Sequence, residues 1–206
     1  MRDWHIDAFG QIEAGEETDN MAVEDMAEDT EEPLERYRLY RFLTELEDLL
    51  RQKPNEADLV RQVAPMVRRL LTSSYWLQFD YSEPDPQKGW SVDMVYDETD
   101  FPLTVQMVAW KPGTVSPVHN HATWGIVAFI DGTEKNVFWR EKESGGVERI
   151  GEQTFEAGDI VTFEPEAIHH IEAMGEDTVV SFNIYGKTDY QNRYQFDPEA
   201  GTKKLF

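Results

Sequence analysis

Apolar residues recur at helical spacing in the first third of the chain. Between residues 34 and 50 they return every three or four positions, and Pro54 ends this run. A second run of the same kind covers residues 59–71, with Pro65 inside it as a residue that can kink a helix. We therefore expect an amphipathic helical segment over residues 34–79 that packs against the rest of the protein.

The period of the pattern changes after residue 90. Residues 80–90 have the composition of a loop, and the chain then breaks into short runs of β-branched and aromatic residues. Turn signals such as DG at 131–132 and AGD at 157–159 separate these runs. Many short strands at this spacing predict a mainly β barrel over residues 80–206. The clearest predicted strands are 103–110, 124–130, 135–141, 160–163 and 178–185.

Negative charge is concentrated at the N-terminal end. The chain has a net charge of −22, and residues 1–35 hold 13 acidic residues against one base. We expect residues 1–33 to be a solvated, flexible acidic leader, of which residues 1–30 can be removed without unfolding the barrel. Two alternatives stay open: apolar residues such as Trp4, Ile6 and Phe9 dock the leader in a groove, or its acids bind a basic partner.

Composition excludes several classes of function. A strongly acidic surface repels phosphate backbones and anionic lipid, so we expect no nucleic-acid or membrane partner. The sequence has neither an apolar run of about 20 residues nor a secretory signal, which favours a cytoplasmic location. The absence of cysteine removes disulfides, thiolate-ligated metal sites and a cysteine nucleophile together.

Four of the five histidines lie in two small clusters, which read HNH and HH. In a strand, residues i and i+2 point to the same face, roughly 7 Å apart. His119 and His121 can therefore face one metal ion together, and the second cluster can supply a third imidazole. Adjacent strand residues face opposite sides, so His169 and His170 cannot both be ligands. Imidazole ligands accept iron, nickel, copper or zinc, and the ligand type alone does not choose among them.

The residues around the first cluster resemble the first motif of the cupin superfamily. Gly113 precedes His119 by the expected spacing, His121 follows, and Gly132 lies at the expected turn. Most metal-binding cupins add a glutamate shortly after this histidine pair, but residues 123–126 contain no carboxylate. The resemblance therefore implies a site made of neutral imidazoles alone.

The second cluster resembles the second cupin motif. That motif runs from a Gly-Asp turn to a histidine eleven residues on, which here joins Gly158 to His169 and leaves His170 structural. The resemblance implies a small jelly-roll barrel, the double-stranded β-helix, with the helical segment packed on it. It also implies one metal ion held by His119, His121 and His169.

Over roughly residues 35–195 the chain is similar to the three-histidine cupins that act as thiol dioxygenases. The runs AWKPGTVSPVHNHATWG and AIHHIEAMGEDTVVSFNIYG carry this similarity. The family has a Ser-x-His-x-Tyr triad, which reads here as Ser181, Asn183 and Tyr185. The resemblance implies that Tyr185 hydrogen-bonds the substrate, with Ser181 and Asn183 positioning it, although Asn183 replaces the histidine of the proton relay.

The same resemblance implies Fe(II) as the cofactor and a small thiol and dioxygen as substrates, with a sulfinate as the product. The arginine that binds the substrate carboxylate in cysteine dioxygenases would fall near Val92 and is missing. Arg193, eight residues after Tyr185, matches the arginine that mercaptopropionate-type enzymes use instead. Trp124 is expected to wall the pocket.

Two other functions fit the same residues. Another metal cupin enzyme, such as a dioxygenase of a carbon substrate or an isomerase, needs the same three histidines. A cupin can also be a non-catalytic metal-binding or ligand-binding module, because a fold does not imply an activity. The change of the triad histidine to Asn183 and the missing arginine near Val92 favour the non-catalytic module.

Overall fold

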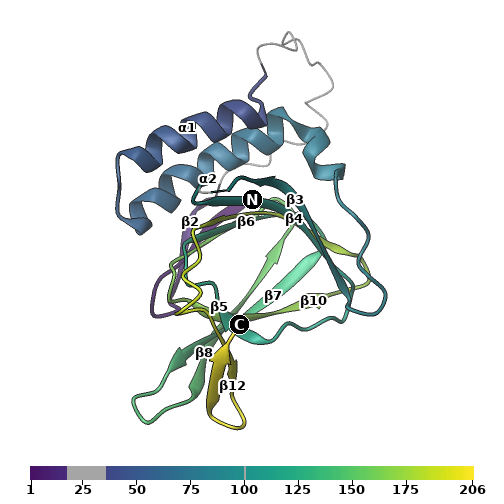
Figure 1. The fold of residues 1–206 in the computed structure, drawn as a ribbon. Coiled ribbons are helices and arrows are strands. Elements are labelled where there is room, and N and C mark those ends of the chain that lie inside the picture. Colours follow the sequence, from purple (N-terminus) through teal and green to yellow (C-terminus); the bar gives the residue numbers. More distant parts are fainter. Residues whose placement is uncertain (18–35, 100) are drawn as a thin grey trace.

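Two facing β-sheets and a pair of helices form the fold (Figure 1). The structure is a computed structural model, and it describes residues 1–17, 36–99 and 101–206. One sheet has seven strands in the order β2-β1-β9-β6-β11-β4-β3, and the other has six in the order β13-β12-β5-β10-β7-β8. The strands are β1 (Arg2–Ile6), β2 (Ile12–Glu17), β3 (Trp90–Asp97), β4 (Leu103–Trp110), β5 (Val118–Asn120), β6 (Gly125–Asp131), β7 (Thr133–Glu141), β8 (Val147–Glu156), β9 (Ile160–Phe163), β10 (Ile168–Met174), β11 (Val179–Gly186), β12 (Tyr194–Asp197) and β13 (Thr202–Leu205).

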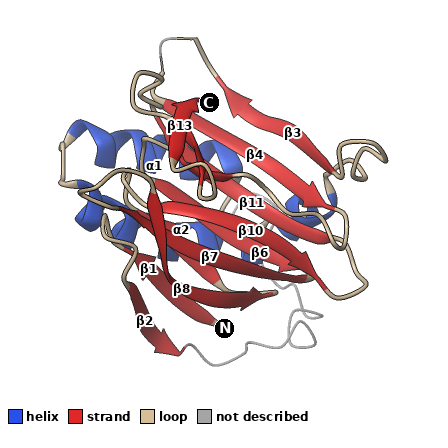
Figure 2. Cartoon of the chain, turned by 90° about the horizontal axis from the view of Figure 1, so that it is seen from below, coloured by secondary structure: helices blue, strands red, loops and turns tan. Residues whose placement is uncertain are grey.

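The pairing of the central strands is nested, as in a jelly roll. β4 pairs with β11, β5 with β10, β6 with β9 and β7 with β8, and all four pairs are antiparallel. A chain paired in this way is one long hairpin rolled into two sheets, which is the double-stranded β-helix (Figure 2). The prediction of a mainly β, cupin-type fold with helices toward the N-terminal end is confirmed.

The helices cover the outer face of the seven-stranded sheet (Figure 1). They are α1 (Leu39–Arg51) and α2 (Glu56–Ser73), followed by a short 3₁₀ helix at Tyr75–Phe79. The Asn55 side chain caps α2 by accepting a hydrogen bond from the Asp58 backbone N–H, and Pro65 lies inside α2 without ending it. Among the described residues, no helix is both long enough and apolar enough to cross a membrane.

Alternation along β4 and β11 separates an apolar outer face from a more polar inner one. Residues on the outer face pack against the helices, whereas their neighbours in sequence line a pocket between the sheets. The two faces therefore have different roles. The outer face forms a core under the helices, and the inner face presents polar side chains to the pocket. The outer residues are Leu103, Val105, Met107, Ala109, Val180, Phe182 and Ile184; the inner ones are Thr104, Gln106, Val108, Trp110, Ser181, Asn183 and Tyr185.

The expectation of a solvated leader over residues 1–33 is wrong for residues 1–17. β1 pairs in parallel with β9, and Ile6 is fully buried in the interior cluster beside Phe163. The His5 ring hydrogen-bonds the Thr162 hydroxyl at 2.8 Å and lies 3.3 Å from a Glu164 carboxylate oxygen. These contacts dock the segment as the alternative expectation proposed, and residues 18–33 lie outside the described part of the chain.

Truncating Ile6 tests whether β1 belongs to the cooperative unit. Ile6→Ala should lower the free energy of unfolding by about 2–5 kcal/mol, because it leaves a cavity in a packed interior. Phe9→Ala is the matched control, since Phe9 is 64% exposed and should change stability by less than about 0.5 kcal/mol. Urea unfolding measures the free energy of unfolding of both variants. If Ile6→Ala destabilised the protein as little as Phe9→Ala, β1 would lie outside the cooperative unit.

Candidate metal centre

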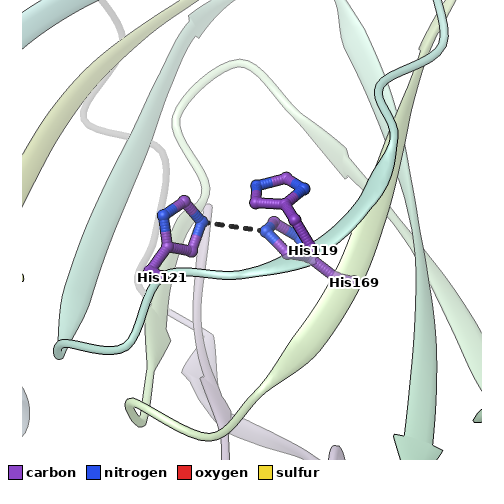
Figure 3. Close-up of side chains that lie close together, drawn as sticks. All are labelled: His119, His121 and His169. Carbon is purple, nitrogen blue, oxygen red and sulfur yellow. Dashed lines mark hydrogen bonds between the residues drawn. The ribbon is translucent and has the colours of Figure 1, made fainter. Parts of the chain in front are cut away.

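Three histidines from two paired strands converge in the barrel (Figure 3). β5 and β10 place His119 directly opposite His169, and His121 follows the end of β5. The potential ligand atoms of the three lie within 4.8 Å of one another, and the Nε2 atoms of His121 and His169 are 3.0 Å apart. The structure thus brings together the three histidines that the sequence singled out.

The three imidazoles are neutral at physiological pH. Burial lowers the pKa of His119 to about 4 and holds the pKa values of His121 and His169 well below the usual value. Neutral imidazole is the form that binds metal ions. This donor set fits a divalent cation that prefers nitrogen ligands, so His119, His121 and His169 could hold one metal ion.

Hydrogen bonds fix the tautomer of two of these rings. His119 Nδ1 lies 2.9 Å from the Pro117 carbonyl oxygen, and His169 Nδ1 lies 2.7 Å from the Asn136 Oδ1 atom. Both oxygens can only accept, so both Nδ1 atoms carry the proton. The Nε2 lone pairs of His119 and His169 are therefore free for a metal ion.

His170 lies apart from this cluster. Its Nδ1 accepts a hydrogen bond from the Trp139 indole at 2.9 Å, and its Nε2 is 3.4 Å from a Glu172 carboxylate oxygen. Because neighbouring residues on a strand face opposite sides, β10 directs His169 inward and His170 outward. This arrangement agrees with the structural role expected for His170.

β11 presents the Ser181, Asn183 and Tyr185 side chains to the pocket on one face. The Asn183 Nδ2 atom donates to the Tyr185 hydroxyl across 3.4 Å, which is a weak hydrogen bond. The Asn183 Oδ1 atom is buried and has no hydrogen-bond partner in the described part of the chain. The altered triad therefore still connects Asn183 to Tyr185, although only loosely.

The Tyr185 ring stacks on His121, with ring centroids 4.7 Å apart and planes at 21°. This contact needs Gly125 on the neighbouring strand, because a Cβ atom there would come within 2.9 Å of the tyrosine ring. Burial raises the pKa of Tyr185, and the Glu134 carboxylate raises it further. The phenol beside His121 is therefore protonated and can donate a hydrogen bond.

Arg193 also reaches the pocket, as the sequence predicted. Its guanidinium lies 4.6 Å from the centre of the Phe206 ring, and its Nε is buried with no hydrogen-bond partner among the described residues. The loop that carries it is tied to Asn120, whose Nδ2 donates to the Asn192 carbonyl and whose Oδ1 accepts from the Tyr194 N–H. The middle residue of the HNH sequence thus positions the arginine.

The expectation that Trp124 walls the pocket is wrong. The pocket between the sheets has a volume of about 640 Å³ and is lined by Trp110 and Val92, but not by Trp124. Trp124 is 6% exposed and packs in the core between the sheet and the helices, together with Ile126. The two residues are i and i+2, so both fall on the helix side of the sheet.

Sequence reasoning missed two polar side chains inside the barrel. Glu134 and Asn136 both line the pocket, and the Asn136 Nδ2 atom donates to a Glu134 carboxylate oxygen at 2.7 Å. Burial raises the pKa of Glu134 to about 7, against the lowering effect of that hydrogen bond. Their signal was present in the sequence, because they alternate with the same period as the buried Phe138 on β7.

No known protein-family model matches the sequence. Among solved structures, the chain is similar to the cupin domain of Schizosaccharomyces pombe Cnp3, at 10% identity and a TM-score of 0.40, over 50% of this chain and 64% of that one. It is also similar to a cupin 2 conserved barrel domain protein from Salinispora arenicola, at 15% identity and 0.39, over 52% and 88%. The match to Bacillus subtilis oxalate decarboxylase, which has Mn(II) centers, has 21% identity and a TM-score of 0.41, over 53% and 29%. These similarities are too low to establish a shared activity, and the fold assignment rests on the strand pairing.

Single replacements test the ligand set. Alanine in place of His119, His121 or His169 should remove most of the bound metal, because two imidazoles bind a divalent ion far more weakly than three. His170→Ala should retain it, because that side chain faces outward. Elemental analysis after anaerobic loading with Fe(II) measures the content, and circular dichroism checks the fold. Loss from the His170 variant and retention by the His169 variant would place the third ligand one residue later.

The buried carboxyl of Glu134 should make stability depend on pH. Its pKa rises from 4.5 to about 7 on folding, so the native state holds this proton more tightly than the unfolded chain does. The stabilisation is complete below pH 4.5 and is lost as the pH rises through 7, a change of about 3 kcal/mol. Urea unfolding of the metal-free protein at pH 5 and pH 8 should show this loss, and Glu134→Gln should lack it. A wild type and variant with parallel pH profiles would contradict the assignment.

Proposed function

We propose that this protein is a metal-dependent cupin enzyme, a non-haem Fe(II) dioxygenase that oxidises a thiol to a sulfinate. The observation that carries the proposal is the cluster of three neutral histidines with a protonated tyrosine stacked on one of them. Within the described residues, this cluster contains no carboxylate. Its ligands leave the charge of a divalent ion uncompensated, which favours an anionic ligand such as a thiolate.

The proposed reaction balances without a further reductant. A thiolate and dioxygen give a sulfinate, so two sulfur–oxygen bonds form, the oxygen–oxygen bond breaks, and sulfur supplies all four electrons. Bound iron would supply the Lewis acidity that favours thiolate over thiol and the redox chemistry that dioxygen requires. The protein's own part is to bind, orient and shield the substrate.

Each polar residue of the pocket has a proposed part in that task. The Tyr185 phenol, which stays protonated, would donate a hydrogen bond to the substrate, and Asn183 would hold the phenol in place. Ser181, on the same face of β11, would help Asn183 to position that phenol. The Arg193 guanidinium would bind a carboxylate, since it lines the pocket that contains the three histidines. Apolar walls from Val127 and Phe163 would exclude water.

The size of the pocket bears on the substrate. A volume of about 640 Å³ falls in the range of sites for drug-sized ligands, and a thiol of two or three carbons would fill only a small part of it. The pocket extends from the histidines to Trp90, Val92 and Met94 on the edge strand β3. We therefore propose that the substrate is a thiol that carries an additional apolar group.

A metal-dependent isomerase is the second candidate, and Glu134 is the observation that favours it. A buried carboxyl with a pKa of about 7 can take and return a proton at neutral pH. An isomerase consumes no dioxygen, whereas a dioxygenase does. Oxygen uptake therefore separates the two candidates in one measurement.

The test is anaerobic loading with Fe(II), followed by oxygen uptake and mass spectrometry with a panel of thiols. The panel should contain 3-mercaptopropionate, cysteine and 2-aminoethanethiol, each beside an analogue with an added phenyl or butyl group. We expect one dioxygen consumed for each sulfinate formed, and no uptake by zinc-loaded protein or by the His169→Ala variant. If no thiol caused oxygen uptake or gave a sulfinate, the proposal would be rejected.

Arg193→Ala tests how the substrate carboxylate is bound. The Michaelis constant for a carboxylate thiol should rise roughly ten- to a hundredfold, because a charge-assisted hydrogen bond in a buried site is lost. The constant for an amine-bearing thiol should change little. Lys203→Ala is the control, since Lys203 is an exposed cation paired with Glu141. Unchanged constants for carboxylate thiols would show that Arg193 does not contact the substrate.

A further inference from the structure

A chain of hydrogen bonds between buried polar side chains extends from His169, one of the three histidines. His169 Nδ1 donates to Asn136 Oδ1 at 2.7 Å, and Asn136 Nδ2 donates to Glu134 Oε1 at 2.7 Å. The three residues are 4%, 1% and 4% exposed, respectively. Strand pairing holds them in place, because β7 and β10 are paired along their length. Hydrogen bonds that are shielded from water in this way are strong and directional.

The chemistry of these groups makes this chain of hydrogen bonds one-directional. The Glu134 Oε1 atom accepts a hydrogen bond, and only the Nδ2 end of the Asn136 amide can donate one. That choice turns the Oδ1 end toward His169. Because Oδ1 can only accept, the His169 proton must lie on Nδ1, and its Nε2 keeps the lone pair that points toward His121 Nε2, 3.0 Å away.

An asparagine without this carboxylate has no fixed direction. It could turn its Nδ2 group toward His169, and the imidazole would then carry its proton on Nε2. A protonated Nε2 has no lone pair for a metal ion. The tautomer of His119 does not depend on an amide side chain in this way. Its Nδ1 donates to the main-chain carbonyl oxygen of Pro117, which can only accept.

We propose that Glu134 is a positioning residue of the metal centre, which acts through Asn136 to fix His169 in the tautomer that binds metal. The inference rests on the proposed metal-dependent function and deepens it. Glu134 would not contact the metal ion. It would raise the fraction of molecules in which His169 carries its proton on Nδ1 and can bind metal through Nε2. Partners that orient metal-binding histidines in this way are typically worth 10- to 100-fold in metal affinity.

The strand that carries His169, β10, supplies a matched control. Glu172 lies beside His170 as an acid beside an imidazole, with the two side chains 3.4 Å apart, but on the outer face of β10. Glu172→Gln is the same substitution as Glu134→Gln and changes the side-chain volume equally little. It should leave the metal centre unaltered.

The first experiment measures the zinc affinity of the full-length protein by competition with a chromophoric chelator. Glu134→Gln should weaken binding about tenfold, and Asn136→Leu should weaken it 10- to 100-fold. Glu172→Gln should stay within about twofold of the wild type. Adding Asn136→Asp to the Glu134→Gln variant should restore most of the affinity, because an aspartate beside His169 can only accept. A purely structural role would lower the thermal midpoint without changing affinity or being rescued.

The second experiment reads the tautomer without any metal. Nitrogen-detected histidine NMR on the metal-free protein should show His169 with its proton on Nδ1 in the wild type, and a mixture of tautomers in the Glu134→Gln variant. A folded Glu134→Gln variant with wild-type zinc affinity and an unchanged tautomer would overturn the inference, as would an Nε2–H tautomer in the wild type. If only the thiol assay fails, the zinc affinity and the His169 tautomer still test the role of Glu134. If the wild type binds no metal, the proposed function is rejected, and the His169 tautomer alone decides the role of Glu134.

Discussion

The antiparallel pairing of β5 with β10 is the constraint on which the site depends. It sets His119 directly opposite His169, although the two residues are far apart in sequence. A slip of one residue would turn His169 outward and bring His170 into the barrel, because side chains on a strand alternate between its faces. The nested pairing of the other strands holds this register from both sides. The three-histidine cluster is therefore a consequence of how the jelly roll closes.

The seven-stranded sheet separates stability from chemistry. Its outer face packs on α1 and α2, so the inner face does not need to be apolar throughout. β1 extends this sheet beside β9, which carries Phe163 against His169. The space between the two sheets can then accommodate buried polar groups that cost stability, of which Glu134, on β7 of the six-stranded sheet, is the clearest case. Such a cost is common where a protein prepares a site for function.

The pocket contains a cation although the chain as a whole is acidic. The chain as a whole is strongly acidic, with a net charge of −22, yet Arg193 faces the neutral histidines inside the barrel. Asn120 links the histidine pair to this arginine. It lies between His119 and His121 in sequence, and its side chain binds the loop that carries Arg193. The HNH sequence therefore contributes two histidines to the candidate metal centre and also positions the loop that carries Arg193.

The sequence by itself determined the local features of this protein. Short apolar runs between glycine turns specified the strands, and the spacing of the histidines and of Ser181, Asn183 and Tyr185 specified which of them share a face. Alternation cannot say which face is the inside, and so Trp124 was assigned to the pocket and Glu134 was missed. Nor can it say which distant strand a segment pairs with, because the hydrogen bonds that dock β1 on β9 join residues more than 150 positions apart. Only the tertiary structure decided these points, since burial depends on what packs against a face from elsewhere in the chain.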